Sequence, residues 1–321
     1  MSELLRVENL KKYFKTPAGN LHAVDDVSFT IDGGETLGVV GESGCGKSTL
    51  GRTILGLVES TDGRVFYKND DVTDVKGRAR RELRKTMQII FQDPFSSLNP
   101  RMTVENLIAD PLKTYRLHKN RAELRKHVRE LMDVVGLAER LGNSYPHELD
   151  GGRRQRIGVA RALALDPDFI VCDEPVSALD VSIQAQILNL LQDLQEERGI
   201  AYMFITHDLS VVKHISNDIM VMYLGVMVEK SPSEDLFEFP LHPYTKGLLS
   251  AIPVPDIHIE KEPIIMEGEL TSPIEPEAGC RFAARCPFAR ERCHTEFPEN
   301  EEVMPGHFVS CHFVREINQS L

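Results

Sequence analysis

The stretch GESGCGKST, residues 41–49, has the residue types and the spacing of a loop that binds phosphate groups. It fits the pattern G-x-x-x-x-G-K-[ST], follows the short apolar run Thr36–Val40 and opens a helical segment. Its glycines let backbone N–H groups turn toward phosphate oxygens, and the helix N-terminus adds positive potential. Lys47 would reach the β- and γ-phosphates, and Ser48 would hold Mg²⁺. The residues expected to contact the nucleotide are Gly41, Glu42, Ser43, Gly44, Cys45, Gly46, Lys47, Ser48 and Thr49.

Cys45 lies inside this loop and has two interpretations. The first is a small residue that fills space in the core. The second is a reactive thiol, because the N-terminus of a helix lowers the pKa of a nearby cysteine. In the second case, alkylation of the thiol would block nucleotide binding and the nucleotide would protect it.

Two further segments place polar side chains directly after buried strands. FIVCDEP puts Asp173 and Glu174 after an apolar run, and FITHD puts His207 after another. In nucleotide hydrolysis of this type the first acid orients Mg²⁺, and the following glutamate polarises the attacking water. Neighbouring strand ends would bring His207 near Glu174. The alternatives are a solvated pair of acids and a structural histidine.

The composition limits the class of protein. The chain has 321 residues, 41% of them hydrophobic, and a formal net charge of −12. Such an acidic chain does not indicate a general nucleic-acid binder. The sequence holds no apolar run near 18 residues and no apolar block typical of a signal peptide, so we expect a cytoplasmic protein whose membrane contact goes through partners.

Strand and helix patterns alternate along the chain, which predicts an α/β fold. Residues 1 to about 90 are rich in strand patterns and contain one predicted helix. A helical insertion is expected over 92–165, where Leu124, Val128, Leu131 and Val135 form one apolar stripe. The composition becomes rich in proline from Pro253, which predicts a linker or extended arm.

The C-terminal segment contains four cysteines at the spacing C-x5-C-x6-C-x17-C, namely Cys280, Cys286, Cys293 and Cys311. Four thiols in a short segment suggest a bound metal. Zinc sites usually show closely spaced C-x₂₋₄-C pairs, which are missing, whereas iron–sulfur clusters accept irregular spacings. Zinc and unmetallated thiols remain alternatives. Nearby residues that could replace a ligand or offset thiolate charge are His294, His307, His312, Arg281, Arg285, Arg290 and Arg292.

Residues 1 to about 250 resemble the ATPases of ATP-binding cassette (ABC) transporters. The resemblance rests on six motifs that occur in order and at the family's spacing, GESGCGKST, FQDP, LDGGRRQR, FIVCDEP, SALD and ITHD. It implies a P-loop nucleotide-binding domain over 1–252, with a RecA-like core, a β-rich subdomain and the helical insertion. A small cysteine-rich metal domain over 253–321 would follow, and the resemblance also favours a [4Fe–4S] cluster there.

The resemblance implies a role for each matching residue. Gln92 would contact Mg²⁺ and sense the membrane subunit, Asp173 would orient Mg²⁺, and Glu174 would be the general base. His207 would contact the γ-phosphate, and Asp180 of the D-loop SALD would cross the interface of an ATPase dimer. The adenine would stack on an aromatic ring at Phe14 or at its neighbour, Tyr13.

More narrowly, the chain resembles the ATPases of dipeptide and oligopeptide importers, through FQDPFSSLNPRMTV, HPYTKGLLSAIP and the cysteine tail. This implies two transmembrane permease subunits, a second ATPase subunit, and an extracytoplasmic solute-binding protein as an indirect partner. The chain would lie on the inner face of the cell membrane. Importers of nickel or sugar, a non-transport ABC ATPase and a non-hydrolysing regulatory subunit are the alternatives.

In the family that the chain resembles, the signature motif binds the γ-phosphate of the ATP held by the other subunit. Here the motif is LDGGRRQR, which departs from the family pattern. Asp150 stands where serine is usual, beside Gly151 and Gly152, and Arg153 replaces the usual glutamine. Aspartate caps a helix as well as serine does, which is worth about 1 kcal/mol. A carboxylate 4 Å from a phosphate charge is repelled by roughly 4 kcal/mol at an effective dielectric of 20. Arg153 and Arg154 could soften this repulsion. We therefore expect a heterodimer in which the partner's ATP site is impaired.

Overall fold

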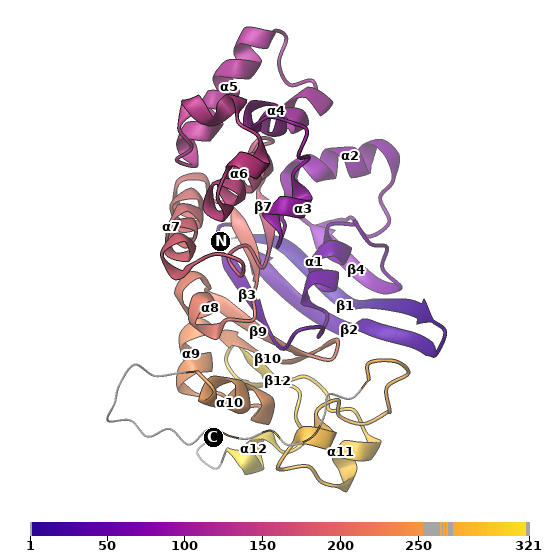
Figure 1. The fold of residues 1–321 in the computed structure, drawn as a ribbon. Helices are drawn as coiled ribbons and strands as arrows, with labels where there is room; N and C mark the ends of the chain where they lie inside the picture. Colours follow the sequence, from indigo (N-terminus) through magenta and orange to yellow (C-terminus); the bar gives the residue numbers. More distant parts are fainter. Residues whose placement is uncertain (1, 253–263, 265, 267, 269–271, 319–321) are drawn as a thin grey trace, which may run out of the picture. The chain divides into compact units, whose positions relative to one another are not determined.

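The computed structural model describes residues 2–252, 264, 266, 268 and 272–318 (Figure 1). These residues form two compact units. The first unit comprises residues 32–35 and 75–205. The second comprises residues 2–31 and 36–74 and the described part of 206–321. The linker predicted from Pro253 falls largely outside the described residues. In the part of the chain that the structure describes, no helix is both long and apolar enough to cross a membrane.

The first unit contains three parallel strands in the order β6 (Met87–Ile90), β7 (Phe169–Asp173) and β8 (Ala201–Ile205). Every residue of β7 and β8 is buried, as expected for strands covered on both faces. The remaining elements of this unit are α2 (Gly77–Thr86), α3 (Pro94–Ser97), α4 (Val104–Thr114), α5 (Arg121–Val134), η1 (Glu139–Asn143), η2 (Pro146–Glu148), α6 (Gly151–Leu163) and α7 (Val181–Arg198).

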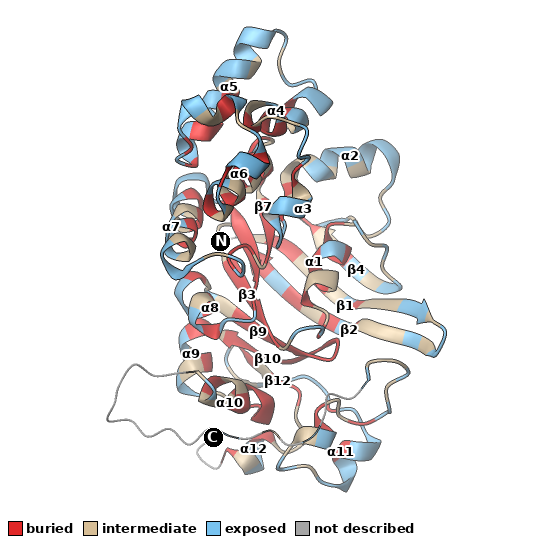
Figure 2. Ribbon diagram, in the orientation of Figure 1, coloured by how far each residue is buried: buried red, intermediate tan, exposed pale blue. Residues whose placement is uncertain are grey.

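The predicted apolar stripe lies on α5, where Val128 and Leu131 are buried and Leu124 is half-buried. The prediction of one helix before residue 90 is wrong, because α2 is a second one. None of the residues of α2 is buried (Figure 2), and its sequence GRARRELRKT therefore carries no apolar stripe that could reveal it.

The second unit holds two sheets. In the first, the antiparallel order is β2 (Gly19–Asp32), β1 (Glu3–Thr16), β4 (Asp62–Tyr67) and β5 (Asp70–Asp71). In the second, β3 (Thr36–Val40) runs parallel to β9 (Asp218–Tyr223), and β9 pairs antiparallel with β10 (Val226–Pro232). The helices between or beside these strands are α1 (Lys47–Ile54), α8 (Leu209–Ile215), α9 (Ser233–Glu238) and α10 (Pro243–Ser250).

The cysteine-rich tail joins this second sheet. Strand β12 (His307–Val309) pairs antiparallel with β10, and β11 (Glu301–Met304) pairs with β12. The other tail elements are η3 (Ala283–Arg285), α11 (Glu291–Thr295) and α12 (Val314–Ile317). The described tail residues therefore belong to the same compact unit as the phosphate loop.

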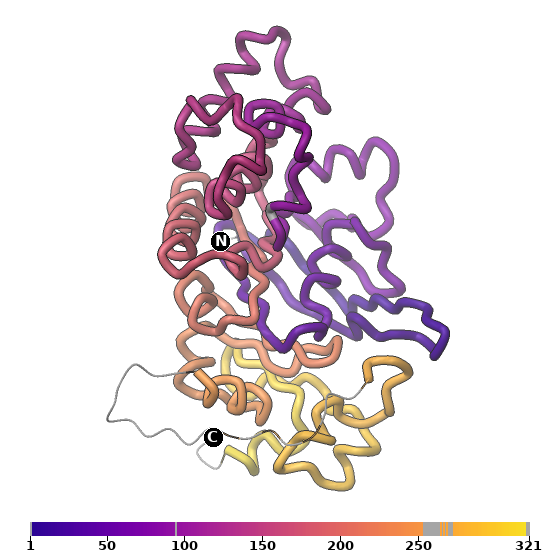
Figure 3. Tube along the Cα trace, in the orientation of Figure 1, coloured from indigo at the N-terminus to yellow at the C-terminus, as the bar shows by residue number. Residues whose placement is uncertain are grey.

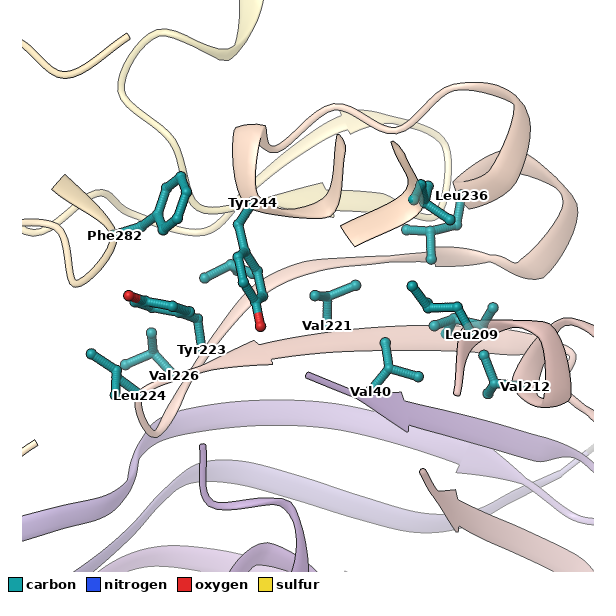
Figure 4. Close-up of a cluster of buried hydrophobic side chains, with 13 residues drawn as sticks. Val40, Leu209, Val212, Val221, Tyr223, Leu224, Val226, Leu236, Tyr244 and Phe282 are labelled. Carbon is teal, nitrogen blue, oxygen red and sulfur yellow. The ribbon is translucent and has the colours of Figure 1, made fainter. Parts of the chain in front are cut away.

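A hydrophobic cluster joins β9, α8, α10 and the tail (Figure 4). Three aromatic rings lie at its tail side, with centroid distances of 4.7 Å between Tyr223 and Tyr244, 5.3 Å between Tyr223 and Phe282, and 5.4 Å between Tyr244 and Phe282. Edge-on contacts of this kind add to the free energy of burial. Phe282, which lies between the first two tail cysteines, is 1% exposed and anchors the tail to α10 and β9.

A buried carboxylate joins β10 to the start of α10 and to β12. Glu229 is fully buried and accepts hydrogen bonds from the backbone N–H groups of Leu241 and His242, at 2.7 and 3.0 Å. Its Oε1 also lies 2.7 Å from Nε2 of the buried His307. These three partners compensate for the loss of hydration at the carboxylate.

Burial lowers the pKa of His242 to about 4, against the opposing charge of Glu229. Its Nδ1 accepts the N–H of Tyr244 and caps α10, which requires the neutral ring. The unfolded chain takes up this proton near pH 6.5, whereas the folded chain resists it. The contribution of His242 to stability is therefore fully present above about pH 6.5, and up to about 3 kcal/mol of it is lost as the pH falls to 4.

We expect the free energy of unfolding, measured in urea, to fall more between pH 7 and 4.5 for the wild-type chain than for His242→Asn. Asparagine keeps a capping acceptor but does not titrate. Because the other acidic and basic groups are common to both proteins, the difference between their two profiles reports His242. Parallel profiles would contradict the expectation.

Candidate functional site

The phosphate loop, residues 41–49, connects β3 to α1 through backbone conformations that require glycine. Gly41 has φ +151°, and a Cβ atom there would lie 2.2 Å from the carbonyl oxygen of Met222. Gly46 has φ +103°, and its Cβ would lie 1.9 Å from the carbonyl oxygen of Ala23. These approaches involve backbone atoms, which cannot move aside cheaply. The loop therefore packs closely between β2 and the end of β9, and its backbone conformation is restricted.

Lys47 is the first residue of α1 and is 5% exposed. Its ammonium group donates to the carbonyl oxygens of Gly41 and Glu42, at 2.7 and 3.0 Å. The side chain thus folds back over the loop whose backbone surrounds the predicted phosphate position. A cation held there by two carbonyl groups is suited to bind phosphate oxygens.

Cys45 does not have the lowered pKa that its place near a helix N-terminus suggested. The side chain is 3% exposed, and this burial raises the pKa of the thiol although Lys47 opposes the shift. The loss of hydration outweighs the positive potential of the helix end. Of the two interpretations of Cys45, the structure therefore supports the core filler.

Glu42 is held from three sides, which the sequence did not indicate. Its N–H donates to the hydroxyl oxygen of Tyr244 at 3.0 Å, and its carbonyl oxygen accepts from Lys47. Its carboxylate accepts from both terminal nitrogens of Arg285, at 2.9 to 3.2 Å. Tyr244 belongs to the stretch HPYTKGLLSAIP, on which the resemblance to peptide importers rests. The sequence therefore pointed to this residue but did not show that it contacts the phosphate loop.

The two aromatic residues proposed for adenine differ in their surroundings. The ring of Tyr13 stacks on the ring of His22, with centroids 3.9 Å apart and an interplanar angle of 18°. Its hydroxyl group donates to Asp25, and burial together with this bond raises the pKa of Tyr13. Phe14 is 36% exposed and lies under the ammonium of Lys12. Tyr13 is therefore held in place, whereas Phe14 is more open.

Asp25 connects Tyr13 to the tail. Its Oδ2 lies 2.9 Å from Nδ1 of His22 and accepts from Arg281 at 2.6 Å. Burial pushes the pKa of Asp25 upward, but these partners and Tyr13 outweigh it and hold the pKa below its ordinary value. Asp25 therefore stays a carboxylate at neutral pH.

In the first unit, the structure brings Gln92 and Glu174 together. Nε2 of Gln92 donates to Oε2 of Glu174 at 2.8 Å. Asp173 is fully buried at the end of β7, and Glu174 follows it with φ +47°. Residues other than glycine rarely adopt this conformation, which costs on the order of 1–3 kcal/mol. The N–H of Glu174 donates to Ile205 of β8 at 3.0 Å, which stabilises the turn.

The signature segment begins α6 and shows the predicted cap. Oδ1 of Asp150 accepts the N–H of Arg153 at 2.8 Å, so aspartate replaces serine without loss of the cap. Nε of Arg153 lies 3.4 Å from Oδ2 of Asp150, and both side chains are at least half exposed. Arg154 donates instead to the carbonyl oxygen of Pro146 at 2.7 Å and lies over the ring of Phe95. Arg153, and not Arg154, is therefore the counter-charge of Asp150.

The glycines of the signature let α6 approach the D-loop and α7. A Cβ atom on Gly152 would lie 2.6 Å from Ile183, and one on Gly151 would lie 3.1 Å from Leu179. Asp180 caps α7 by accepting the N–H of Ile183 at 3.1 Å. Signature and D-loop are therefore packed as one surface in the first unit. In the second unit, His207 is exposed and immediately precedes Asp208, which caps α8.

The four tail cysteines lie near one another, but the described side chains are not arranged as a metal site. Burial, together with the charges of Cys293, Cys311 and Cys286, raises the pKa of Cys280 to about 12. Among the described residues, however, no three histidine, cysteine, aspartate or glutamate side chains are arranged to hold a metal ion. The Cys280 N–H donates to the Cys293 carbonyl oxygen at 2.7 Å. The structure therefore does not support the predicted metal domain.

Two of the predicted substitutes, His307 and His312, and the arginines of the tail have other partners, whereas His294 is exposed. His307 lies against Glu229, and a ring nitrogen of His312 lies 2.9 Å from the carbonyl oxygen of Glu296. Arg290 and Arg292 pair with Glu316 and Glu296 at the surface, where all four side chains are more than half exposed. Arg281 and Arg285 do not; they are mostly buried and reach Asp25 and Glu42.

Two family models match the sequence. One, described as ABC transporter, matches residues 24–177, and the other, described as oligopeptide/dipeptide transporter, C-terminal region, matches residues 228–293. The second match covers the sheet strand β10, α10 and three of the four tail cysteines. The two matches together span both the phosphate loop and the tail.

Curated relatives match almost the whole chain. The oligopeptide transport ATP-binding protein OppF of Salmonella typhimurium is 53% identical over 94% of this chain and 90% of its own length. OppF of Escherichia coli is 52% identical over 95% and 92%. AppF of Bacillus subtilis, also an oligopeptide transport ATP-binding protein, is 49% identical over 96% and 97%.

Solved structures of ATP-binding cassettes share the fold. The dimeric cassette MJ0796 with bound ADP and phosphate is 31% identical, with a TM-score of 0.66 over 72% of this chain and 99% of that one. The cassette cbiO1 of Clostridium perfringens is 27% identical, with a TM-score of 0.66 over 74% and 92%. The shared part corresponds to an ABC ATPase fold with mixed α/β sheets.

Proposed function

Since the chain belongs to the oligopeptide and dipeptide group of ABC transporter ATP-binding proteins, we propose that it hydrolyses ATP to drive peptide uptake through a membrane importer. The observation that carries this proposal is the identity of about half of all residues with oligopeptide transport ATP-binding proteins, which extends through the C-terminal region. A nickel or sugar importer would use the same machinery, but the names of the relatives favour peptides.

We assign the chemistry to the residues that the motifs indicated. Lys47 and the N–H groups of the phosphate loop bind the phosphates, and Ser48 and Asp173 hold Mg²⁺. Glu174 is the general base, and its hydrogen bond to Gln92 supports this assignment because it sets the position of the carboxylate. The strained backbone of Glu174 supports it further, since such strain is concentrated at functional sites.

The remaining assignments concern the nucleotide base and the partner subunits. Tyr13 stacks on the adenine, His207 contacts the γ-phosphate, and Asp180 reaches the second ATPase subunit. Two permease subunits receive the conformational change of the ATPase subunits near Gln92. A solute-binding protein delivers the peptide on the extracytoplasmic side. The chain then lies on the inner face of the cell membrane. A non-transport ABC ATPase is the runner-up, and the match to the transporter C-terminal region counts against it.

The function is tested with the chain assembled with its permeases and second ATPase in vesicles. We expect uptake of labelled di- and oligopeptides that depends on ATP, with neither Ni²⁺ nor sugar taken up. Glu174→Gln should abolish ATP turnover and uptake while ATP binding persists, because it removes the base but not the loop. Glu130→Gln, an exposed substitution on α5, is the matched control. Uptake of Ni²⁺ or sugar alone, or normal turnover in Glu174→Gln, would contradict the proposal.

We propose that Asp150 weakens the ATP site formed with the partner subunit. The carboxylate is more than half exposed, and Arg153, the side chain that pairs with it, is half exposed and 3.4 Å away. An exposed pair at this distance offsets only part of a repulsion of roughly 4 kcal/mol. The transporter would then have one strong hydrolytic site, which the phosphate loop, Glu174 and His207 of this chain supply.

Asp150→Asn and Asp150→Ser should therefore raise the ATPase rate of the assembled transporter at least several-fold. Asparagine and serine both keep the cap of α6, so that the gain reports the lost charge. Asn120→Ser exchanges the N-cap of α5 and is the control for capping alone. An unchanged rate in both Asp150 variants would disprove the assignment.

The finer proposal for the tail is that Cys280, Cys286, Cys293 and Cys311 bind a [4Fe–4S] cluster. Two observations support it: the four thiols are close enough to influence one another, and Nε and Nη1 of Arg281 are buried without a partner among the described residues. The arrangement of the described side chains does not fit a metal ion as it stands. Binding would therefore have to draw the thiols together.

Purification without oxygen, followed by iron, sulfide and zinc analysis and an absorption spectrum, tests this. We expect about four irons and four sulfides per chain, with absorption near 400 nm. Cys293→Ser should lose both, whereas Cys172→Ser, at a fully buried strand position, should keep them. One zinc or no metal would refute the cluster and leave the ATPase assignment untouched.

A further inference from the structure

Two tail arginines make contacts that no motif of the nucleotide site explains. Arg281 and Arg285 lie between Cys280 and Cys286, and both side chains are about 90% buried. Arg281 pairs with Asp25 and Arg285 with Glu42. The first carboxylate holds Tyr13, and the second belongs to the phosphate loop. The tail therefore contacts the two segments that bind the base and the phosphates in the proposed function.

The pair formed by Arg285 and Glu42 is bidentate. Nη1 donates to Oε2 at 2.9 Å and Nη2 donates to Oε1 at 3.2 Å, while the guanidinium also lies near the hydroxyl group of Tyr223. The Glu42 side chain is 24% exposed, compared with 59–60% for the acids that pair with Arg290 and Arg292. Water screens a pair in this position less than an exposed one.

The tail has little freedom to withdraw these arginines. Its backbone joins the beginning of β2, next to the turn from β1, through the bridge between Leu21 and Ile274 and through the bond from the His22 N–H to the carbonyl oxygen of Pro273 at 2.9 Å. Figure 3 shows the trace returning to this end of the hairpin. Phe282, between the two arginines, is packed on Tyr223 and Tyr244 (Figure 4).

Residues of the loop and of the tail also line one pocket together. A cavity of about 310 Å³ is lined by loop residues 42–45 on one side and by residues 223–224 and 272–273 on the other. The carboxylate of Glu42 has Arg285 of the tail as its counter-charge. It belongs to the loop that receives a triphosphate in the proposed function. Without that counter-charge, the carboxylate would repel the phosphates.

We propose that the tail is a positioning brace for the nucleotide site, in which Arg285 neutralises and holds Glu42 and Arg281 holds Asp25 and, through it, Tyr13. This inference rests on the proposed function, because it requires the loop to bind ATP. Arg281 and Arg285 are positioning residues, since they act through Glu42 and Asp25. The brace needs no metal in the tail.

The test measures equilibrium binding of ATP and of inorganic tripolyphosphate to the full chain, at low and high salt. Arg285→Gln should weaken both ligands about tenfold, and less at high salt, because a charge on the loop is left unpaired. In the Glu42→Gln background the same substitution should have almost no effect. Arg281→Gln should weaken ATP but not tripolyphosphate, since it acts through the base end.

Arg292→Gln is the matched control, because Arg292 lies in the same tail and its ion pair within the described part of the chain is with the exposed Glu296. It should bind both ligands as the wild type does. The melting temperature of each variant shows whether it folds, and Arg285→Lys should recover part of the affinity of Arg285→Gln. If the wild type fails to bind ATP, the proposed function itself fails. If it binds, but Arg285→Gln either has no effect or weakens binding equally in the Glu42→Gln background, the brace is refuted.

Discussion

The contacts at Glu42 set the geometry on which the nucleotide site depends. The backbone N–H is fixed by Tyr244, the carbonyl oxygen by Lys47 and the carboxylate by Arg285. Gly41, directly before it, tolerates no Cβ because the carbonyl oxygen of Met222 is too close. A loop that must present N–H groups to phosphates cannot use them to stabilise itself. The neighbouring strands, α10 and the tail therefore hold it from outside.

Burial separates the tail's arginines into two kinds. Arg290 and Arg292 form exposed pairs, which contribute little because water screens them. Arg281 and Arg285 are largely buried, and each would be costly to leave without its carboxylate. The same side-chain type thus serves solubility at one position and the geometry of the nucleotide site at another.

Asp150 shows that local folding and binding chemistry can accept different residues. A helix cap requires only an acceptor oxygen with the right reach, and aspartate supplies it as serine does. A phosphate site also requires that the acceptor carry no negative charge. The substitution therefore leaves α6 intact, while it alters the surface that α6 presents beside the D-loop.

The sequence alone determined the phosphate loop and strands β3, β7 and β8, because their signals are local: motif spacing and apolar runs. It missed α2, which has no buried face, and it left two interpretations of Cys45 open, between which burial decides. Only the tertiary structure showed that β12 joins the sheet of the phosphate loop and that Arg281 and Arg285 reach Asp25 and Glu42, about 250 positions away. Charge pairing at that separation has no period or motif, because it depends on how the chain returns in space and on which side chains lose their water when it does.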